Sequence, residues 1–559
     1  IFQIIGGSYS RSNPVVTSTR NRLYRGYFNL PGYEGHLAAF DLNPDGSIIT
    51  PETWDAGKVM KGNGRGTVST WVDGKSKGDF KDVDFTDKGG KKLETYLNPL
   101  GEDINNDGKV KKDDSQAIVG FTLDANYDDG KNGPGYYKGV RSGKWLLGDI
   151  YHSTPLVVGA PVFNFPDAAF PKKYSDFKTT WKSRETIVYV GANDGMLHAF
   201  SDKDGKEKFG IIPNNLLGKL KDLRTNSHQF FVDSSPRAYD VLIAGSWSTV
   251  VISGERGGGN AYFALDVTDP KDANYPIMLW DVTDPGMGNT WSRPEIGWVR
   301  ISGVEKFVAF VGGGYSTTAD VGNTFYVIDI QDGSILRKFT VGASSNKVPA
   351  GATAFDGDLD GRVNGVYFGD INGVLWKIKI DGEEDISKWQ LINLYTPSTN
   401  TPVFYPPAVT KNNQGKILVY YGQGNELNIF NIDNNSFFEI WDNADSGVKN
   451  WEESLGAGEK VLAAPSLANN VVYFTTWKYT GDKTDCGAGM GRLYGLTTTS
   501  LGVTGDIGAL LLDPLTGTDI GSKNKYFDIT KYYPEHMGIP SSPVVTNGTI
   551  YISTSINAN

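Results

Sequence analysis

The sequence contains little cysteine, no long apolar run and no excess of positive charge. Cys486 is the single cysteine among 559 residues, so no disulfide can form within the chain. No apolar stretch reaches the roughly 18 residues that a membrane-spanning helix needs, which argues against a transmembrane segment. The net charge of −10 argues against nucleic acid as a partner, because phosphate binding requires clustered Lys and Arg side chains.

Motifs for catalysis are also missing. The five histidines are scattered and match no metalloprotease spacing. Neither a G-x-S-x-G nucleophile elbow nor a phosphate-binding loop ending in GK[ST] occurs. The sequence therefore predicts a protein that is not an enzyme. It opens at Ile1 without a signal peptide, which is typical of a processed or partial chain.

Glycine and aromatic residues are abundant. The chain has 69 glycines and 12% aromatic residues, a composition that favours many short strands joined by tight turns. The length fits one large repeat domain together with a smaller one. We therefore expect an all-β protein with two folded regions.

A strand motif of the form Val/Ile-Tyr/Phe-x-Gly recurs through most of the chain. Its copies are spaced by about 53 to 78 residues, as expected for four-stranded propeller blades with variable loops. A Ser/Ala/Tyr-x-Pro strand precedes most copies, and an alternating strand with an Asp-Gly or Asp-Pro turn follows several of them. The copies end at Gly191, Gly254, Gly312, Gly369 and Gly422, with degenerate copies at Thr475 and Ser553.

These repeats predict a seven-bladed β-propeller over 149–559, closed by pairing of its first and last strands, since closure removes exposed sheet edges. Residues 1–148 read as a smaller, irregular β-rich module packed on the propeller. Within that module, 26–46 looks like an isolated copy of the strand pattern. The convincing helix of the chain is expected at 214–223, where leucines recur at helical spacing.

A first acidic loop, residues 356–364, carries oxygen-bearing side chains at alternating positions. Calcium takes six to eight oxygen ligands, and a loop with ligands at positions 1, 3, 5, 7 and 9 can surround one ion. Closely packed carboxylates would repel one another without a cation. A solvated Asp-Gly turn is the alternative. The predicted calcium (Ca2+) ligands are Asp356, Asp358, Asp360, the backbone carbonyl of Arg362, and Asn364.

A second acidic loop, residues 103–114, follows the twelve-residue calcium-loop spacing. Gly108 stands at the turn position, and the last position has Asp in place of the usual Glu. Dockerin-type loops also end in Asp. We therefore predict a second calcium site, with ligands Asp103, Asn105, Asp107, the backbone carbonyl of Lys109, and Asp114.

Several segments, in this order, resemble the C-terminal domain of the PilY/PilC family of type IV pilus biogenesis factors and tip-associated adhesins. The resemblance covers nearly all of 145–559. The segments that carry it are LGDIYHSTPLVVGAP (147–161), VYVGANDGMLHAF (188–200), GGGNAYFALDVTDP (257–270), TWSRPEIGWV (290–299), VYFGDINGVLWKIKI (366–380), VYYGQG (419–424) and VVYFTTW (471–477).

The resemblance implies a modified, quinoprotein-like propeller whose calcium loop sets the balance between pilus extension and retraction. It implies pilins or minor pilins as partners, contact with host-cell or surface receptors, and roles in adhesion and twitching motility. The expected location is the cell surface, at the pilus tip or outer membrane. Asn364 stands where the family has Asp, which should weaken calcium binding. The family's Asp-x-Ser-x-Ser metal motif does not occur in this chain.

Two other functions share the strand pattern. A dehydrogenase that uses pyrroloquinoline quinone (PQQ) would need a cofactor pocket and an Asp base. The adjacent cysteines of many such enzymes are missing here. A non-catalytic scaffold for outer-membrane assembly would share the blades without needing the acidic loops. Fold alone does not choose among these functions.

Overall fold

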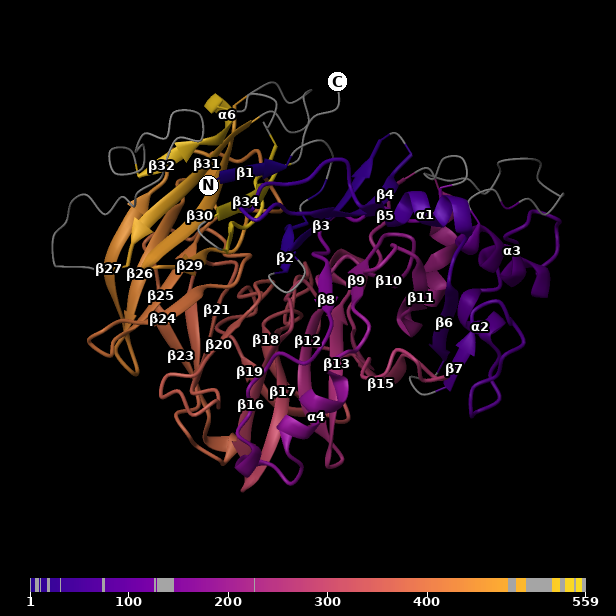
Figure 1. Cartoon of the computed structure of the whole chain (residues 1–559), viewed down its shortest axis with the longest axis horizontal. Helices are drawn as coiled ribbons and strands as arrows, with labels where there is room; N and C mark the ends of the chain where they lie inside the picture. The colour runs from indigo at the N-terminus through magenta and orange to yellow at the C-terminus, as the bar shows by residue number, and fades with distance from the viewer. Residues whose placement is uncertain are drawn as a thin grey trace.

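The computed structural model describes residues 2–5, 10, 12–17, 21–30, 32–72, 76–124, 127, 145–225, 227–480, 489–498, 525–532, 538–546 and 549–554. Cys486 lies outside these residues. The chain forms a series of small, mainly antiparallel sheets that follow one another around the molecule in sequence order (Figure 1).

Each predicted repeat forms one sheet, and the Val/Ile-Tyr/Phe-x-Gly motif is its second strand. These second strands are almost entirely buried, because both of their faces pack against neighbouring sheets. They are β9 (Ile187–Gly191), β13 (Ser246–Gly254), β17 (Val304–Gly312), β21 (Gly365–Gly369), β25 (Ile417–Gly422), β30 (Val471–Tyr479) and β34 (Thr549–Ser553).

The first strands of successive sheets contact one another, so they face the common axis. Most of them follow the predicted x-Pro motif. They are β8 (Leu156–Val158), β12 (Arg237–Ile243), β16 (Glu295–Ile301), β20 (Thr353–Phe355), β24 (Ala408–Lys411), β29 (Ser466–Ala468) and β33 (Val544–Thr546).

The third and fourth strands complete six of the sheets on the outside. The third strands are β10 (Leu197–Ser201), β14 (Tyr262–Asp266), β18 (Thr324–Asp329), β22 (Leu375–Lys379), β26 (Ser436–Asp442) and β31 (Gly489–Thr497). The fourth strands are β11 (Glu207–Ile212), β15 (Ile277–Val282), β19 (Ile335–Thr340), β23 (Gln390–Tyr395), β27 (Gly447–Ser454) and β32 (Tyr526–Asp528). A short strand, β28 (Glu459–Lys460), also pairs with β30.

The N-terminal region is joined to both ends of the series of repeats. Strand β1 (Phe2–Ile5) pairs in parallel with β34 and so completes the last sheet. A separate four-stranded sheet contacts that sheet through β2 and β33. On its other side, the Tyr24 hydroxyl donates a hydrogen bond to Asp202 in the first repeat. The strands of this added sheet are β2 (Val15–Thr17), β3 (Arg22–Asn29), β4 (Glu34–Asp41) and β5 (Trp54–Asp55).

The chain is therefore a seven-bladed β-propeller with a β-rich N-terminal region, which confirms the predicted fold class. The predicted closure within 149–559 is wrong: β8 of the first repeat pairs with β9 and not with the last strand. Strand β34 pairs instead with β1, and the N-terminal sheet lies between the last repeat and the first. Two further N-terminal strands, β6 (Thr67–Val72) and β7 (Ser76–Asp79), extend the first repeat through parallel pairing of β6 with β11. We still propose residue 148 as the boundary between the N-terminal region and the repeats.

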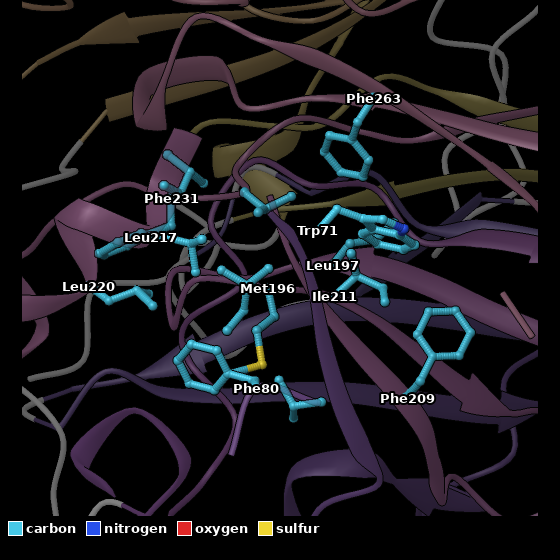
Figure 2. Close-up of a cluster of buried hydrophobic side chains, with 14 of the residues drawn as sticks. Trp71, Phe80, Met196, Leu197, Phe209, Ile211, Leu217, Leu220, Phe231 and Phe263 are labelled. Atoms are coloured by element: carbon cyan, nitrogen blue, oxygen red, sulfur yellow. The ribbon is translucent and has the colours of Figure 1, made fainter. Parts of the chain in front are cut away.

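Buried side chains tie this extension to the repeats. Trp71 of β6 and Phe80 lie against side chains of the first repeat and of the segment that follows it (Figure 2). Burying a large apolar side chain contributes about 1.5–3 kcal/mol. The labelled members of this cluster are Trp71, Phe80, Met196, Leu197, Phe209, Ile211, Leu217, Leu220, Phe231 and Phe263.

The segment 214–223 is helical, but the prediction that it is the only convincing helix is wrong. That segment is a 3-10 helix, η2 (Asn214–Arg224), and its leucines are buried as their spacing suggested. Further helices are α1 (Ala56–Asn63), α2 (Leu93–Leu97), α3 (Lys112–Leu123), α4 (Tyr174–Trp181) and α6 (Ile529–Tyr532), with short 3-10 turns η1 (Asp167–Ala169), η3 (Arg256–Gly258) and η4 (Ile386–Lys388). The sequence signal of α3 was weak, because Gly120 and the β-branched residues Ile118, Val119 and Thr122 have low helix propensity.

Candidate metal centre

Loop 356–364 joins the first two strands of its sheet. Strand β20 ends and β21 begins with Phe355 paired to Gly365, and the Asn364 N–H donates to the Phe355 carbonyl at 2.9 Å. Gly361 has a φ of 94°, a left-handed conformation that suits glycine. The loop is therefore a hairpin turn held firmly at its base.

Three carboxylates meet in this turn, as the sequence predicted. Asp356, Asp358 and Asp360 each present an oxygen, and these oxygens all lie within 4.8 Å of one another. Asp356 is half-buried, whereas the other two are exposed. Within the described part of the chain, no other group of three acidic, histidine or cysteine side chains meets this condition. Hard carboxylate oxygens at this spacing are the ligands that calcium prefers.

Backbone amides hold two of these carboxylates in place. Asp356 accepts hydrogen bonds from the Leu359 N–H at 2.7 Å and the Gly361 N–H at 2.8 Å. Asp360 accepts from the Arg362 N–H at 2.7 Å. The acidic group is thus partly organised by the loop itself, which lowers the cost of ordering it around an ion.

The side chains of Asn364 and Arg362 are engaged in hydrogen bonds around the loop. The Asn364 Oδ1 atom accepts from the Gly357 N–H at 2.6 Å, and its Nδ2 lies 3.4 Å from Asp358. The Arg362 side chain pairs with Asp360 at 2.8 Å. Ligand roles for Asn364 and for the Arg362 carbonyl therefore stay predictions.

A clamp that the sequence did not suggest holds the loop against the preceding sheet. Arg362 donates two hydrogen bonds to Glu305 of β17, at 2.7 and 3.1 Å, and its guanidinium lies 4.8 Å from the Trp298 ring centroid. The bonds to Glu305 and Asp360 outweigh burial and raise the pKa of Arg362. The clamp joins residues 57 positions apart, so no local motif could have revealed it.

Loop 103–114 is built around one buried carboxylate. Asp114 is fully buried, and its oxygens accept from the N–H groups of Ile104 at 2.7 Å, Asn105 at 3.1 Å and Lys111 at 2.7 Å. Helix α3 begins two residues before Asp114. The carboxylate therefore closes the loop and satisfies backbone donors at the start of a helix.

The remaining predicted ligands of this loop also bind its backbone. Asp103 accepts from Asp107 at 3.1 Å and from Gly108 at 2.8 Å, and Asp107 accepts from the Lys109 N–H at 2.9 Å. The Asn105 Oδ1 accepts from the Asp107 N–H at 3.1 Å. The structure does not gather these side chains into a three-carboxylate group. The second calcium site stays a prediction.

Comparison with known proteins decides the family. Residues 147–389 match the family model described as the PilY1 beta-propeller domain. The chain is 31% identical over 425 residues to type IV pilus biogenesis factor PilY1 of Pseudomonas aeruginosa. The aligned region covers 70% of this chain. The chain is 32% identical over 323 residues to a PilY1 homolog of Xylella fastidiosa, which covers 54% of this chain.

The chain belongs to the PilY1 family. The fold agrees, because the crystal structure of the P. aeruginosa PilY1 C-terminal domain matches with a TM-score of 0.52 and 22% identity. That match covers 65% of this chain and 92% of the crystallised domain. The chain spans 35% of the length of the P. aeruginosa relative and 25% of the X. fastidiosa relative.

A groove runs beside the acidic loop of this PilY1 homologue. Its other wall is the segment between β8 and β9 that carries η1 and α4, including Phe165, Tyr174 and Lys178. Its volume is about 840 Å³. Leu359, at the tip of the loop, is 87% exposed. The acidic loop is thus part of a concave surface.

The described residues contain no helix long and apolar enough to cross a membrane.

Proposed function

We propose that this chain is a calcium-binding, non-catalytic propeller of a pilus-associated protein, in which an ion at loop 356–364 orders the neighbouring groove for docking. The observation that carries the proposal is the group of three carboxylates within 4.8 Å, two of which, Asp356 and Asp360, line that groove. Without a cation, three adjacent negative charges destabilise the hairpin by mutual repulsion.

Calcium binding supplies enough free energy to order such a loop. An ion that binds only the folded loop contributes RT ln(1 + [Ca]/Kd), or about 2.7 kcal/mol at a hundredfold excess over Kd. A site with an amide in the last position suits the weak affinities of extracellular calcium modules, whose Kd is on the order of 10⁻⁴ to 10⁻³ M.

The biological role follows from the relatives, which are named type IV pilus biogenesis factors. We infer that the groove docks a pilin or minor pilin at the cell surface, at the pilus tip or the outer membrane. The calcium-bound form then favours pilus assembly over retraction and supports twitching motility and adhesion to surfaces or host cells. Contact with a receptor would use the same exposed propeller.

The first test is calorimetric titration of calcium into the wild-type chain and the Asp358→Ala variant. Asp358 is exposed, and its carboxylate accepts a long hydrogen bond of 3.4 Å from the Asn364 amide, so its removal should leave the fold intact. We expect saturable binding by the wild type and at least about a tenfold loss of affinity in the variant.

The matched control is Asp332→Ala, which removes an exposed carboxylate from another hairpin turn, between β18 and β19. This variant should bind calcium like the wild type. Equal binding by Asp358→Ala and the wild type would reject the site. An absorbance scan of the purified protein for bound quinone tests the dehydrogenase alternative.

The cellular test places Asp358→Ala in the full-length protein of the native host. We expect fewer surface pili and smaller twitching zones, while Asp332→Ala behaves as the wild type. Normal piliation by a variant that has lost calcium binding would mean that pilus assembly does not depend on calcium at this loop.

A further inference from the structure

A small pocket lies on the propeller axis, away from the acidic loops. Each sheet contributes one equivalent residue to the lining of this pocket. That residue stands two positions before the first strand of the sheet. The volume of the pocket is about 100 Å³. The equivalent residues are Thr154, Ser235, Arg293, Gly351, Pro406, Ala464 and Ser542 from the repeats, and Asn13 from the N-terminal sheet.

Arg293 is the charged residue in this set; the others are small or uncharged. Packing of a propeller needs no charge at this position, because the other sheets have Ala, Gly, Ser, Thr, Pro or Asn there. A long cationic side chain beside the axis therefore calls for a separate explanation.

Among the described residues, Arg293 makes no hydrogen bond or ion pair, and its Nε is buried without a partner. The nearby carboxylate of Glu295 is already paired with Arg237, at 2.8 Å. Burial and Arg237 lower the pKa of Arg293 to about 10, against a smaller opposing effect of Glu295. Arg293 is half-buried, and a buried Nε without an acceptor is costly, so this guanidinium can take an acceptor from outside the chain.

Two neighbouring groups add to this pattern. The Trp291 Nε1 atom is buried without a hydrogen-bond partner, and the guanidinium of Arg256 lies 4.1 Å from the Trp291 ring centroid. Arg256 differs from Arg293 in being compensated, since it pairs with Glu426 and approaches Asp233 at 3.6 Å. The pocket therefore presents unsatisfied donors, and buried donors of this kind call for an acceptor.

The pocket also limits the acceptor. Phe404 and Leu462 supply apolar wall, and the other arginine of the pocket, Arg256, is already paired with Glu426. One uncompensated guanidinium balances one negative charge, and its planar donors match a carboxylate.

We propose that the axial pocket binds a small organic monocarboxylate, with its carboxylate on Arg293 and the Trp291 Nε1 and its apolar body against Phe404 and Leu462. The site is independent of the calcium loops, because none of its residues belongs to them. It gives the propeller a ligand besides any metal ion.

The test is ligand-observed NMR with butyrate, using butyramide as a neutral probe of the same shape. We expect saturable binding of butyrate at millimolar concentrations and at least about tenfold weaker binding of butyramide, since a hydrogen bond to a charged group contributes more than a neutral one. Arg293→Gln should reduce butyrate binding to the butyramide level.

Arg300→Gln is the matched control, because Arg300 lies on β16 of the same sheet, is exposed and does not line the pocket. It should leave butyrate binding unchanged. Gly351→Val is a second variant that keeps the cation: a Cβ at Gly351 would sit 3.6 Å from the Arg293 and Pro406 Cβ atoms, so a larger side chain occupies the pocket. It should block butyrate as well.

Three results would overturn the proposal: no saturable binding of butyrate by the wild type, equal binding of butyrate and butyramide, or unchanged binding by both pocket variants. Thermal unfolding of each variant shows whether it is folded. If Arg293→Gln does not fold, Gly351→Val and the two probes still decide.

Discussion

Asp103 and Asp356 play the same part in the two acidic loops, since each accepts a hydrogen bond at 2.8 Å from the glycine five residues later. The loops differ in how they close. Loop 103–114 closes on Asp114, a fully buried carboxylate that accepts three backbone N–H groups. Loop 356–364 closes on the Asn364 amide, and two of its three carboxylates are exposed.

The difference shows that alternating acidic residues can have two roles: they can bind backbone N–H groups of their own loop, or they can remain available to a cation. In the first loop, the charge of Asp114 is balanced by backbone donors, so the loop stabilises itself. In the second loop, the three carboxylates face one another and solvent, so a cation contributes more. The same spacing in sequence thus predicts a calcium loop in both places, while burial separates a structural carboxylate from an available one.

The largest expected effect is on stability. Asp114→Ala removes a fully buried carboxylate and leaves three backbone N–H groups, two of them on the buried residues Ile104 and Asn105, without their acceptor. We expect a loss of about 3 kcal/mol or more from the free energy of unfolding. Urea unfolding of the N-terminal region, followed by Trp fluorescence in the presence of a calcium chelator, measures it. Lys109→Ala, an exposed change in the same loop, should cost less than about 0.5 kcal/mol.

A small effect of Asp114→Ala in chelator, together with a large one in calcium, would break the comparison. It would mean that Asp114 acts mainly through an ion, as the calcium-loop spacing first suggested. The chelator experiment therefore tests the second predicted calcium site directly.

An intermediate effect is expected from Asn364→Asp. The substitution keeps the oxygen that accepts the Gly357 N–H and adds a negative charge to the acidic group. We expect about a tenfold gain in calcium affinity by calorimetry, because affinity rises with the charge of the ligand set. In chelator the same variant should be less stable than the wild type, since a fourth charge adds repulsion.

Asn412→Asp is the matched control, because Asn412 lies in the neighbouring hairpin turn between β24 and β25 and gains the same charge. It should change calcium affinity by less than about threefold. Equal gains by both variants would mean that the ion senses general surface charge and not a ligand at position 364.

The sequence predicted the parts of this structure that repeat. Each Val/Ile-Tyr/Phe-x-Gly copy became a buried second strand, because local alternation and turn residues are enough to define a strand. Pairing between distant segments was less accessible. Closure was expected within 149–559 from the need to cover edges, but β34 pairs with β1 of the N-terminal region. The addition of β6 to β11 likewise depends on tertiary packing around Trp71.

The candidate site divides in the same way. The grouping of Asp356, Asp358 and Asp360 was predicted from spacing and is present. The clamp from Arg362 to Glu305 was missed, because its partners come from different sheets. In the sequence, Arg293 is one variable residue of a repeated x-Pro motif. Its position in the axial pocket and the missing partner of its Nε can be recognised only in the folded structure.

The smallest expected effect is that of Glu305→Gln, a change in the clamp between Arg362 and Glu305, on calcium affinity. Glu305→Gln weakens the anchor of Arg362 and leaves the three carboxylates in place, so the loop loses order and not ligands. The freed guanidinium also competes for Asp360, which it already contacts at 2.8 Å. We expect a threefold to fivefold loss of calcium affinity, roughly the 0.7–1 kcal/mol of a partly exposed ion pair.

Glu384→Gln, which removes an exposed carboxylate near Arg300, is the control in the same calorimetric titration. If Glu305→Gln abolished binding, the clamp would be part of the site itself, and loop 356–364 would depend on its surroundings as strongly as loop 103–114 depends on Asp114.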